Sequence, residues 1–414
     1  KVAAAMFNKG VTLGSMNRYE AAIAAYDALI ELFRQRQETE ILEKVAAAMF
    51  NKGVTLGSMN RPEKEIAAYD SLIELFGQRT EVKILEKVAA AMSNKGLVLG
   101  SMNRYEAAIT AYDSLIELFG QRKEVKILEK VAAAIINKGL AFGSMNRYEE
   151  EIATYDALIE LFGQRKEVKI LEKVAAAIIN KGLAFGSMNR YEEEIATYDA
   201  LIELFGQRKE VKILEKIAAA MFNKGLAFGS MSLSEKEIAA YDSLIELFGQ
   251  RTEVKILENV AAAMSNKGVT LGSMNRYEAA IAAYDSLIEL FGQRTEHPIV
   301  KINTIAKLLR AKELLKLDRK EDVLADVLML IDHQPCFDDS IELVIDLFID
   351  IAAYGYTEKA LEILLNSTKQ EYLEPLVAGL QLSCGHEVRI AKEILEVAED
   401  VVKRIEARKR ELDD

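Results

Sequence analysis

The chain has 414 residues, half of them hydrophobic, and its 65 acidic against 53 basic side chains give a formal net charge of −12. Half the residues can be buried, which excludes a disordered chain, and the negative charge argues against nucleic acid or an anionic membrane surface as partner. Two cysteines cannot form a disulfide framework and favour a cytoplasmic setting, and no apolar run reaches the roughly 18 residues of a membrane span.

An internal repeat of 43 residues begins at the first residue. The motif Lys-Val-Ala-Ala-Ala starts at Lys1 and returns every 43 residues, with small changes at Lys216 and Asn259, so that seven units fill residues 1–301. Units 130–172 and 173–215 are identical. Because the chain opens inside a repeat and without an initiator Met, we expect its N-terminus to be a cut in a longer parent protein. Such a period predicts a solenoid, in which each unit packs on its neighbours.

Each unit predicts two helices separated by short turns. In the second unit apolar residues at helical spacing predict a first helix over about residues 40–56. The turn at 57–61 contains Asn60, which can adopt a left-handed conformation, and Pro62 then suits the start of a second helix. A tyrosine in the apolar pattern of each second helix is predicted to be core; these are Tyr26, Tyr69, Tyr112, Tyr155, Tyr198, Tyr241 and Tyr284.

The first unit carries Asn8-Lys9-Gly10, then Leu13, Tyr19-Glu20, Ala22-Ile23 and Tyr26. This pattern resembles the tetratricopeptide repeat, and the resemblance covers all seven units. It implies an all-α fold, an α-solenoid or superhelix of stacked antiparallel helix pairs. The unit is longer than the family's usual length of about 34 residues. Met or Ile stands where the family has its tryptophan, and the family's terminal proline is absent, so the pitch is open.

Strict repetition ends at His297-Pro298. Apolar periodicity beyond it predicts three further helix pairs, which we interpret as degenerate repeats that cap the solenoid with a polar last helix. The chain is therefore divided into seven tandem repeats over 1–301 and a degenerate helical cap over 302–414. The predicted pairs are 299–317 with 320–333, 338–353 with 357–366 after a turn at 354–356, and 371–383 with 388–411.

Apolar and Asn side chains lie on the face of the first helix opposite its core stripe. In tetratricopeptide proteins the corresponding face lines a concave groove that holds a peptide or helix, so the resemblance implies a partner-binding surface here. Its expected residues are Phe7, Asn8, Val11, Phe50, Asn51, Val54, Ser93, Asn94, Leu97, Ile136, Asn137, Leu140, Ile179, Asn180, Leu183, Phe222, Asn223, Leu226, Ser265, Asn266 and Val269.

Each of these assignments has a simpler structural alternative. The apolar positions can be packed inner wall between successive first helices, and the Asn side chains can bond within the solenoid rather than to a bound peptide. The Lys that follows each Asn, from Lys9 to Lys267, invites comparison with a carboxylate clamp, although solvated or snorkelling lysine is the preferred interpretation. The acidic runs Glu149–Glu151 and Glu192–Glu194 are interpreted as complements of a helix dipole.

Chemistry-bearing motifs are sparse. His333, Cys336, Cys384 and His386 offer the residue types of a zinc site at non-standard spacings, and independent residues at helix ends are the preferred reading, so no metal or cofactor is predicted. No phosphate loop, nucleophile elbow or zinc-protease motif occurs, so we predict that the chain is not an enzyme.

The sequence thus predicts a cytoplasmic, non-enzymatic scaffold that binds an extended peptide or helix of a partner protein in the groove of its first helices. The alternative is a structural spacer, or a regulatory or self-associating arm of a larger signalling or sensor protein, because near-identical units offer the same surface seven times. Nucleic acid and membrane are not expected as partners. We expect a monomer, or weak self-association through the exposed N-terminal repeat.

Overall fold

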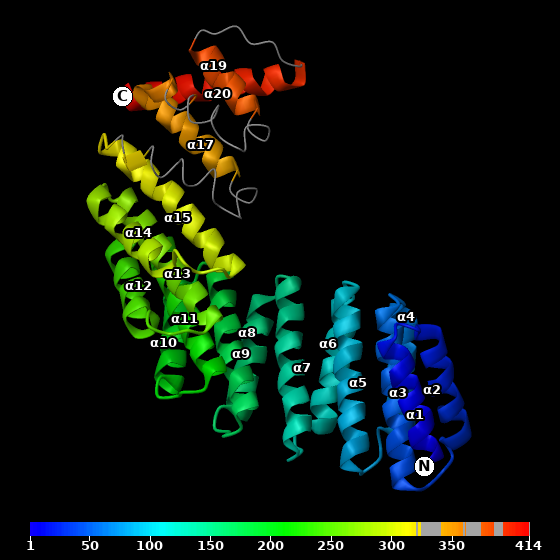
Figure 1. Ribbon diagram of the computed structural model, residues 1–414. Helices are drawn as coiled ribbons and strands as arrows, with labels where there is room; N and C mark the ends of the chain where they lie inside the picture. The colour runs from blue at the N-terminus through cyan, green and yellow to red at the C-terminus, as the bar shows by residue number, and fades with distance from the viewer. Residues whose placement is uncertain (320–321, 324–340, 359–360, 362–373, 385–391, 414) are drawn as a thin grey trace. The chain divides into compact units, whose positions relative to one another are not determined.

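Antiparallel helix pairs follow one another along the chain, as Figure 1 shows. The computed structural model describes residues 1–319, 322–323, 341–358, 361, 374–384 and 392–413, and every regular element among them is a helix. The chain divides into two units, Lys1–Lys216 and Ile217–Asp414. This all-α solenoid of stacked pairs is the fold class that the sequence predicts.

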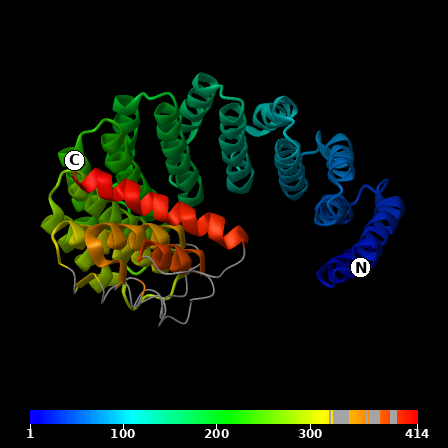
Figure 2. The same ribbon diagram turned by 90° about the horizontal axis from the view of Figure 1, so that it is seen from above.

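The first unit holds five helix pairs, in which a first helix is followed by a second helix, and Figure 2 shows the same pairs from above. Its first helices are α1 (Val2–Ser15), α3 (Thr39–Ser58), α5 (Val82–Ser101), α7 (Val125–Ser144) and α9 (Val168–Ser187). Its second helices are α2 (Tyr19–Phe33), α4 (Pro62–Phe76), α6 (Tyr105–Phe119), α8 (Tyr148–Phe162) and α10 (Tyr191–Phe205). The next first helix, α11 (Val211–Ser230), contains the boundary between the units.

The second unit continues with α12 (Ser234–Phe248), α13 (Val254–Ser273), α14 (Tyr277–Phe291) and α15 (His297–Lys316), and then α17 (Ile341–Ile351), η2 (Ala352–Tyr356), α19 (Glu374–Ser383) and α20 (Lys392–Asp413). Helix α15 packs on α13 and α14, as the first helix of another repeat would, and the predicted domain boundary at 301/302 falls inside it. The predicted turn at 354–356 is wrong: the chain stays helical there as a π-helix, in which the Thr357 hydroxyl donates to the Ala352 carbonyl at 3.3 Å. The predicted helices 320–333 and 357–366 lie mostly outside the described residues.

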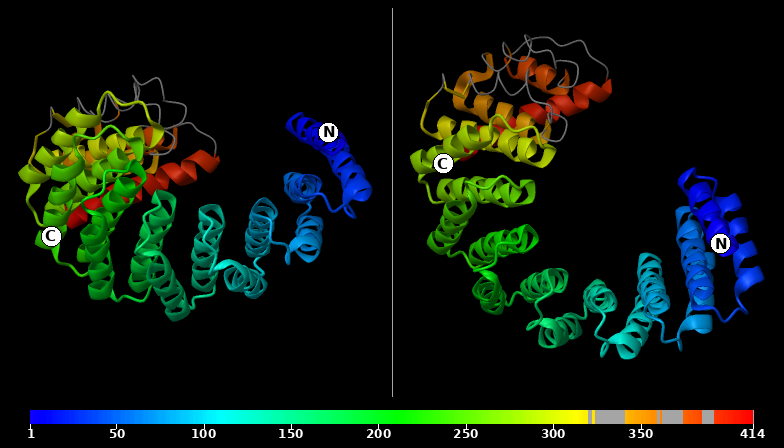
Figure 3. Two further views of the ribbon diagram at one scale, coloured as in Figure 1. Left: turned by 90° about the horizontal axis from the view of Figure 1, so that it is seen from below. Right: turned by 60° about the horizontal axis from the view of Figure 1, so that its bottom comes forward.

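An asparagine closes nearly every first helix in the left-handed conformation that the sequence suggests for Asn60. Its φ is 53°, and the equivalent residues of the other repeats have φ between 57° and 59°. Asparagine tolerates this region better than other residues with a Cβ. The resulting tight connections can be followed in Figure 3.

Each first helix packs on its second helix through a glycine. A Cβ placed on Gly53 would lie 2.3 Å from Cε1 of Tyr69, and the equivalent contact is 2.3–2.4 Å in all seven repeats. The tyrosine rings are buried, with at most 2% exposed, as the periodicity predicts. Glycine therefore sets the close approach of the two helices in every pair.

The two helix layers of the first unit are packed differently. Each first helix contacts the next one, α1 on α3, α3 on α5, α5 on α7 and α7 on α9. Successive second helices make fewer contacts with one another. Between α2 and α4, for example, a hollow of about 660 Å³ lies above α3. The first helices thus form the inner, closely packed layer, and any surface that they share belongs to several repeats.

Candidate functional site

A row of exposed aliphatic side chains runs along the first helices. In the first unit it consists of Val11, Val54, Leu97, Leu140 and Leu183, which are 42–48% exposed; we call it the aliphatic row. Leu226 and Val269 hold the same position in the second unit and are 41% and 47% exposed. Exposed apolar side chains that recur over neighbouring elements are uncommon on a surface without a partner.

The position four residues before the aliphatic row is less open than the sequence suggests. The rings of Phe7, Phe50 and Phe222 are half-buried against the tyrosines of their own second helices, with centroids 5.9–6.3 Å apart. The amines of Lys44 and Lys87 lie over Phe7 and Phe50 at 5.4 and 5.1 Å from the ring centroids. The equivalent residues of the other repeats are buried; they are Ser93, Ile136, Ile179 and Ser265. These four side chains are therefore packed in the interior and do not belong to an open surface.

The Asn residues of the expected site bond within the solenoid. The Asn94 side-chain amide donates to the Tyr69 hydroxyl of the preceding repeat at 3.2 Å, and Asn266 donates to Tyr241 at 3.4 Å. Asn51, Asn137 and Asn180 likewise lie near the tyrosine of the preceding repeat, where each lowers the pKa of that tyrosine's hydroxyl against the larger effect of burial. Asn223 is half-buried, and Asn8 is exposed. One hydrogen-bonding group of these amides is therefore already used, and peptide binding is left to their remaining donor and acceptor.

The lysine that follows each Asn points to the second helices. Lys52 and Lys138 place Nζ 2.6 Å from the carboxylates of Asp27 and Asp113, and Lys95, Lys181 and Lys267 make the same pair at 2.5–2.6 Å. These cations are neutralised by an aspartate of the preceding repeat. This contradicts both a carboxylate clamp and a freely solvated lysine in these five repeats.

Buried glutamates lie between the first and second helices of two repeats, and the sequence interpretation missed them. Glu151 and Glu194, the last members of the two acidic runs, are each 6% exposed and accept a hydrogen bond from Tyr155 and Tyr198 at 3.0 Å. Burial raises the pKa of both carboxyl groups. Both residues lie in the first turn of their helix, as the helix-dipole interpretation requires, but that interpretation did not include their burial against a tyrosine. Their spacing of four from a core tyrosine was the available signal.

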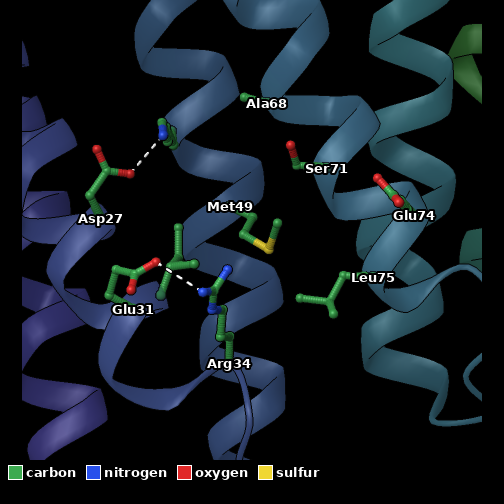
Figure 4. Close-up of a pocket in the computed structure, with 10 residues that line it drawn as sticks. Asp27, Glu31, Arg34, Met49, Ala68, Ser71, Glu74 and Leu75 are labelled. Atoms are coloured by element: carbon green, nitrogen blue, oxygen red, sulfur yellow. Dashed lines mark hydrogen bonds and ion pairs between the residues drawn. The ribbon is translucent and has the colours of Figure 1, made fainter.

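The hollow between the second helices α2 and α4 is a further candidate site. This is the space of about 660 Å³ between α2 and α4, and Figure 4 shows Met49 at its floor. Four of its charged groups form two ion pairs, Lys52 with Asp27 at 2.6 Å and Arg34 with Glu31 at 3.4 Å, and Glu74 is an exposed carboxylate on α4. Neither pair leaves an uncompensated charge for a ligand, so we do not assign a site there.

Metal and membrane sites add little. Among the described residues no cluster of three or more His, Cys, Asp or Glu side chains is arranged to hold a metal ion. Of the four residues considered for zinc, only Cys384 lies within the described part of the chain, where its thiol is free. None of the helices in the described ranges is long and apolar enough to cross a membrane.

Comparison with known proteins agrees with this architecture. The family model described as tetratricopeptide repeat matches residues 3–36, 175–207 and 261–293, and a second model with the same description matches 93–166. No curated protein matches the chain in sequence.

Solved structures with the same fold include the apo form of RapI, which is 13% identical. The match covers 94% of this chain and 100% of that one, with a TM-score of 0.50. The apo form of the quorum sensor NprR from B. thuringiensis is 12% identical over 91% of this chain and 98% of its own, with a TM-score of 0.43. The family matches identify tetratricopeptide repeats in the four matched segments of the chain, and the recurring sequence pattern and stacked helix pairs continue the same unit between them.

Proposed function

We propose that the aliphatic row binds an extended peptide or a helix of a partner protein, along the first helices of consecutive repeats. Tetratricopeptide repeats are in general non-catalytic protein-interaction modules, and this chain is a scaffold of that kind. The observation that carries the finer proposal is the recurrence of a 42–48% exposed Val or Leu at one position of five successive first helices that contact one another, which the second helices with their own exposed leucines do not do to the same extent.

The chemistry of this surface suits sequence-tolerant recognition. Aliphatic anchors contribute affinity by burying apolar area, at about 25 cal/mol per Å². The half-buried Asn side chains next to them, such as Asn94 and Asn137, keep hydrogen-bonding capacity beyond their tyrosine contact. Apolar anchors combined with main-chain hydrogen bonds are a common way for a groove to hold a peptide.

Aliphatic side chains are exposed on the second helices as well, and they provide the matched control. Leu118 and Leu161 are 40% and 41% exposed on α6 and α8. The double variant Leu118→Glu, Leu161→Glu adds the same charge to the outer layer as Val54→Glu, Leu183→Glu adds to the aliphatic row. Substitution at the row avoids Phe50, whose contacts with Tyr69 and Lys87 make Phe50→Glu a risk to folding.

The experiment is affinity capture from a soluble extract with the unmodified chain and both double variants, followed by mass spectrometry. A protein retained by the unmodified chain and the Leu118, Leu161 variant, but lost with the Val54, Leu183 variant, supports binding along the row. Equal retention by all three chains contradicts it. The array would then be better described as a spacer or regulatory arm, the alternative that the identical repeats 130–172 and 173–215 favour.

A further inference from the structure

The fourth residue of each second helix differs between repeats in a way that changes the interior. It is a glutamate in α4, α8, α10 and α12 and an alanine in α2, α6 and α14. Where it is Glu151, the carboxylate turns inward against the first helix, so that a Cβ on Gly143 would lie 2.5 Å from Oε2. Glu65, Glu194 and Glu237 occupy the same place, at 2.5–3.0 Å from the corresponding glycines. These four repeats therefore each enclose their own carboxylate, next to a core tyrosine.

The repeat formed by α13 and α14 fills this place from another element. Its second helix has Ala280, but Glu313 of α15 reaches in, with Oε1 2.7 Å from a Cβ placed on Gly272. Glu313 is only 7% exposed. A carboxylate thus occupies the same place whether it comes from the second helix or from the next repeat.

The repeat formed by α5 and α6 has no such carboxylate. It carries Ala108, and apart from its own helix no atom of the described residues lies within 4 Å of a Cβ placed on Gly100. A hollow of about 290 Å³ opens instead. Gly100, Ala108, Tyr112 and Asn137 are among the residues that line it. Leu97 and Leu140 line it as well, and both belong to the aliphatic row. Ala22 and Gly14 make a similar pair in the first repeat, but there the next helix has Thr55 where this hollow has Ala141, so the lining is not the same.

The hollow retains the hydrogen-bonding groups that serve the carboxylate elsewhere. Tyr112 is 2% exposed, and burial raises the pKa of its hydroxyl to about 12, an effect that the neighbouring Asn137 side chain of the next repeat partly offsets. Its equivalent Tyr155 donates to Glu151 at 3.0 Å. In the described structure Tyr112 has no carboxylate to which it donates, so its hydroxyl proton can serve an incoming acceptor.

We propose that this hollow binds the carboxyl group of a glutamate side chain of the partner segment, in the place that Glu151 occupies in the neighbouring repeat. Tyr112 donates a hydrogen bond to it, Asn137 holds the tyrosine hydroxyl in position, and Leu97 and Leu140 pack on the methylene groups. The inference rests on the proposed function, since it gives one anchor residue of the segment that lies along the aliphatic row. The chain itself supplies the reference geometry, because Glu151 acts as an internal occupant of the equivalent site.

The test uses the full chain and a defined probe, N-acetyl-glutamate N-methylamide, titrated while the Asn137 side-chain amide and Tyr112 ring resonances are followed by NMR. The variant Ala108→Glu installs the residue found in the neighbouring repeat and should weaken probe binding at least tenfold. Ala107→Glu is the matched control. It adds the same charge one residue earlier, where Glu150 pairs with Arg147 at 2.8 Å on the surface of the next repeat, and should leave binding unchanged.

A second variant keeps the proposal testable if Ala108→Glu does not fold. Tyr112→Phe removes only the hydroxyl and should weaken the probe several-fold. No probe-dependent shift in the unmodified chain, or equal shifts in the Ala108→Glu and Ala107→Glu variants, overturns the proposal. The titration needs no partner protein, so its result is independent of the capture experiment. Failure of the titration alone contradicts the glutamate site, and failure of capture alone contradicts binding along the aliphatic row.

Discussion

At the scale of single residues, the structure depends on where glycine stands opposite tyrosine. In each first helix one glycine lies so close to the tyrosine ring of the second helix that not even a methyl group would fit between them. A glycine four residues later in α5, Gly100, has no such neighbour among the described residues. The two positions share one helix, so they separate the cost of overpacking from the intrinsic helix preference of alanine.

We predict that Gly96→Ala lowers the free energy of unfolding by about 2 kcal/mol, because the added methyl meets Tyr112 Cε1 at 2.3 Å in a packed interior. Gly100→Ala should instead raise it by about 0.5 kcal/mol, because alanine loses less entropy in a helix. Guanidinium unfolding followed by circular dichroism measures both. Equal effects of the two changes would show that the tyrosine can move aside.

The buried glutamates give a prediction for pH dependence. Burial raises the pKa of Glu151 and Glu194, so the ionisation of these carboxyl groups as the pH rises through their pKa values reduces stability. The double variant Glu151→Gln, Glu194→Gln should therefore melt roughly 2 °C higher than the unmodified chain at pH 8. As the pH falls through the raised pKa values, the glutamates become neutral and this advantage should disappear.

Exposed glutamates of the same two helices serve as controls for that measurement. Glu149→Gln, Glu192→Gln makes the same change of charge and should have no comparable pH-dependent effect, since both side chains lie in solvent. Calorimetric melting temperatures at pH 8 and pH 5 give the comparison. An advantage of the Glu151, Glu194 variant that grows toward pH 5 would contradict the assigned pKa direction.

At the scale of helices, the first helix of the chain is the least secured. Helix α1 has 14 residues and buries only Ala3 and Gly10, whereas α5 has 20 residues and buries ten of them. Local opening is governed by such packing.

We predict that backbone amides in α1 exchange with solvent about a hundredfold faster than those in α5. Hydrogen exchange followed by mass spectrometry on peptides from the two helices tests this. Similar rates would indicate that α1 gains protection elsewhere, and a dependence on protein concentration would point to self-association through this repeat.

Periodicity predicted these helices well because it reports what each helix needs from its own partner. The predicted first helix over 40–56 is observed as Thr39–Ser58, and the second helix starts at Pro62 as expected. Local chemistry also sufficed for Asn60, since few side chains accept a left-handed turn.

The flanks of the apolar stripe could not be assigned in this way. Ile136 and Ser93 are buried and Leu140 is exposed, although all three lie on the face predicted to be open, because the degree of cover depends on the angle and spacing of the next first helix. The place of Glu151 was hidden for the same reason: a charged residue near a helix start usually lies in solvent, and only the neighbouring glycine makes room for it. The helical path through 354–356 was missed because glycine between aromatic residues suggests a turn.

At a scale larger than the helix, recurring ion pairs join adjacent repeats of the first unit. Pairs such as Lys138–Asp113 at 2.6 Å and Arg147–Glu106 at 2.8 Å link neighbouring repeats, and equivalent pairs occur at Lys52, Lys95 and Lys181 and at Arg61 and Arg104. Surface ion pairs of this kind contribute little stability individually, so their repetition sets the register of one repeat on the next rather than its strength.

Removal of residues 130–172 should leave a folded protein. The excised unit is identical to 173–215, so every new contact is one that the intact chain already makes. We predict an unchanged helical signal per residue and a denaturant m-value smaller by about a tenth, in line with the 43 of 414 residues removed. Loss of the cooperative transition would show that stability is not a sum over neighbouring repeats.

The identity of those two units has a further consequence at the level of the gene. Insertion or deletion of one such unit preserves the reading frame and leaves every junction between neighbouring repeats as it is. Most such events would give a folded protein whose row of exposed aliphatic residues is longer or shorter. Repeat number is then a heritable variable, while the hollow beside Ala108 is kept when either of the two identical units is lost, because the other supplies the same lining.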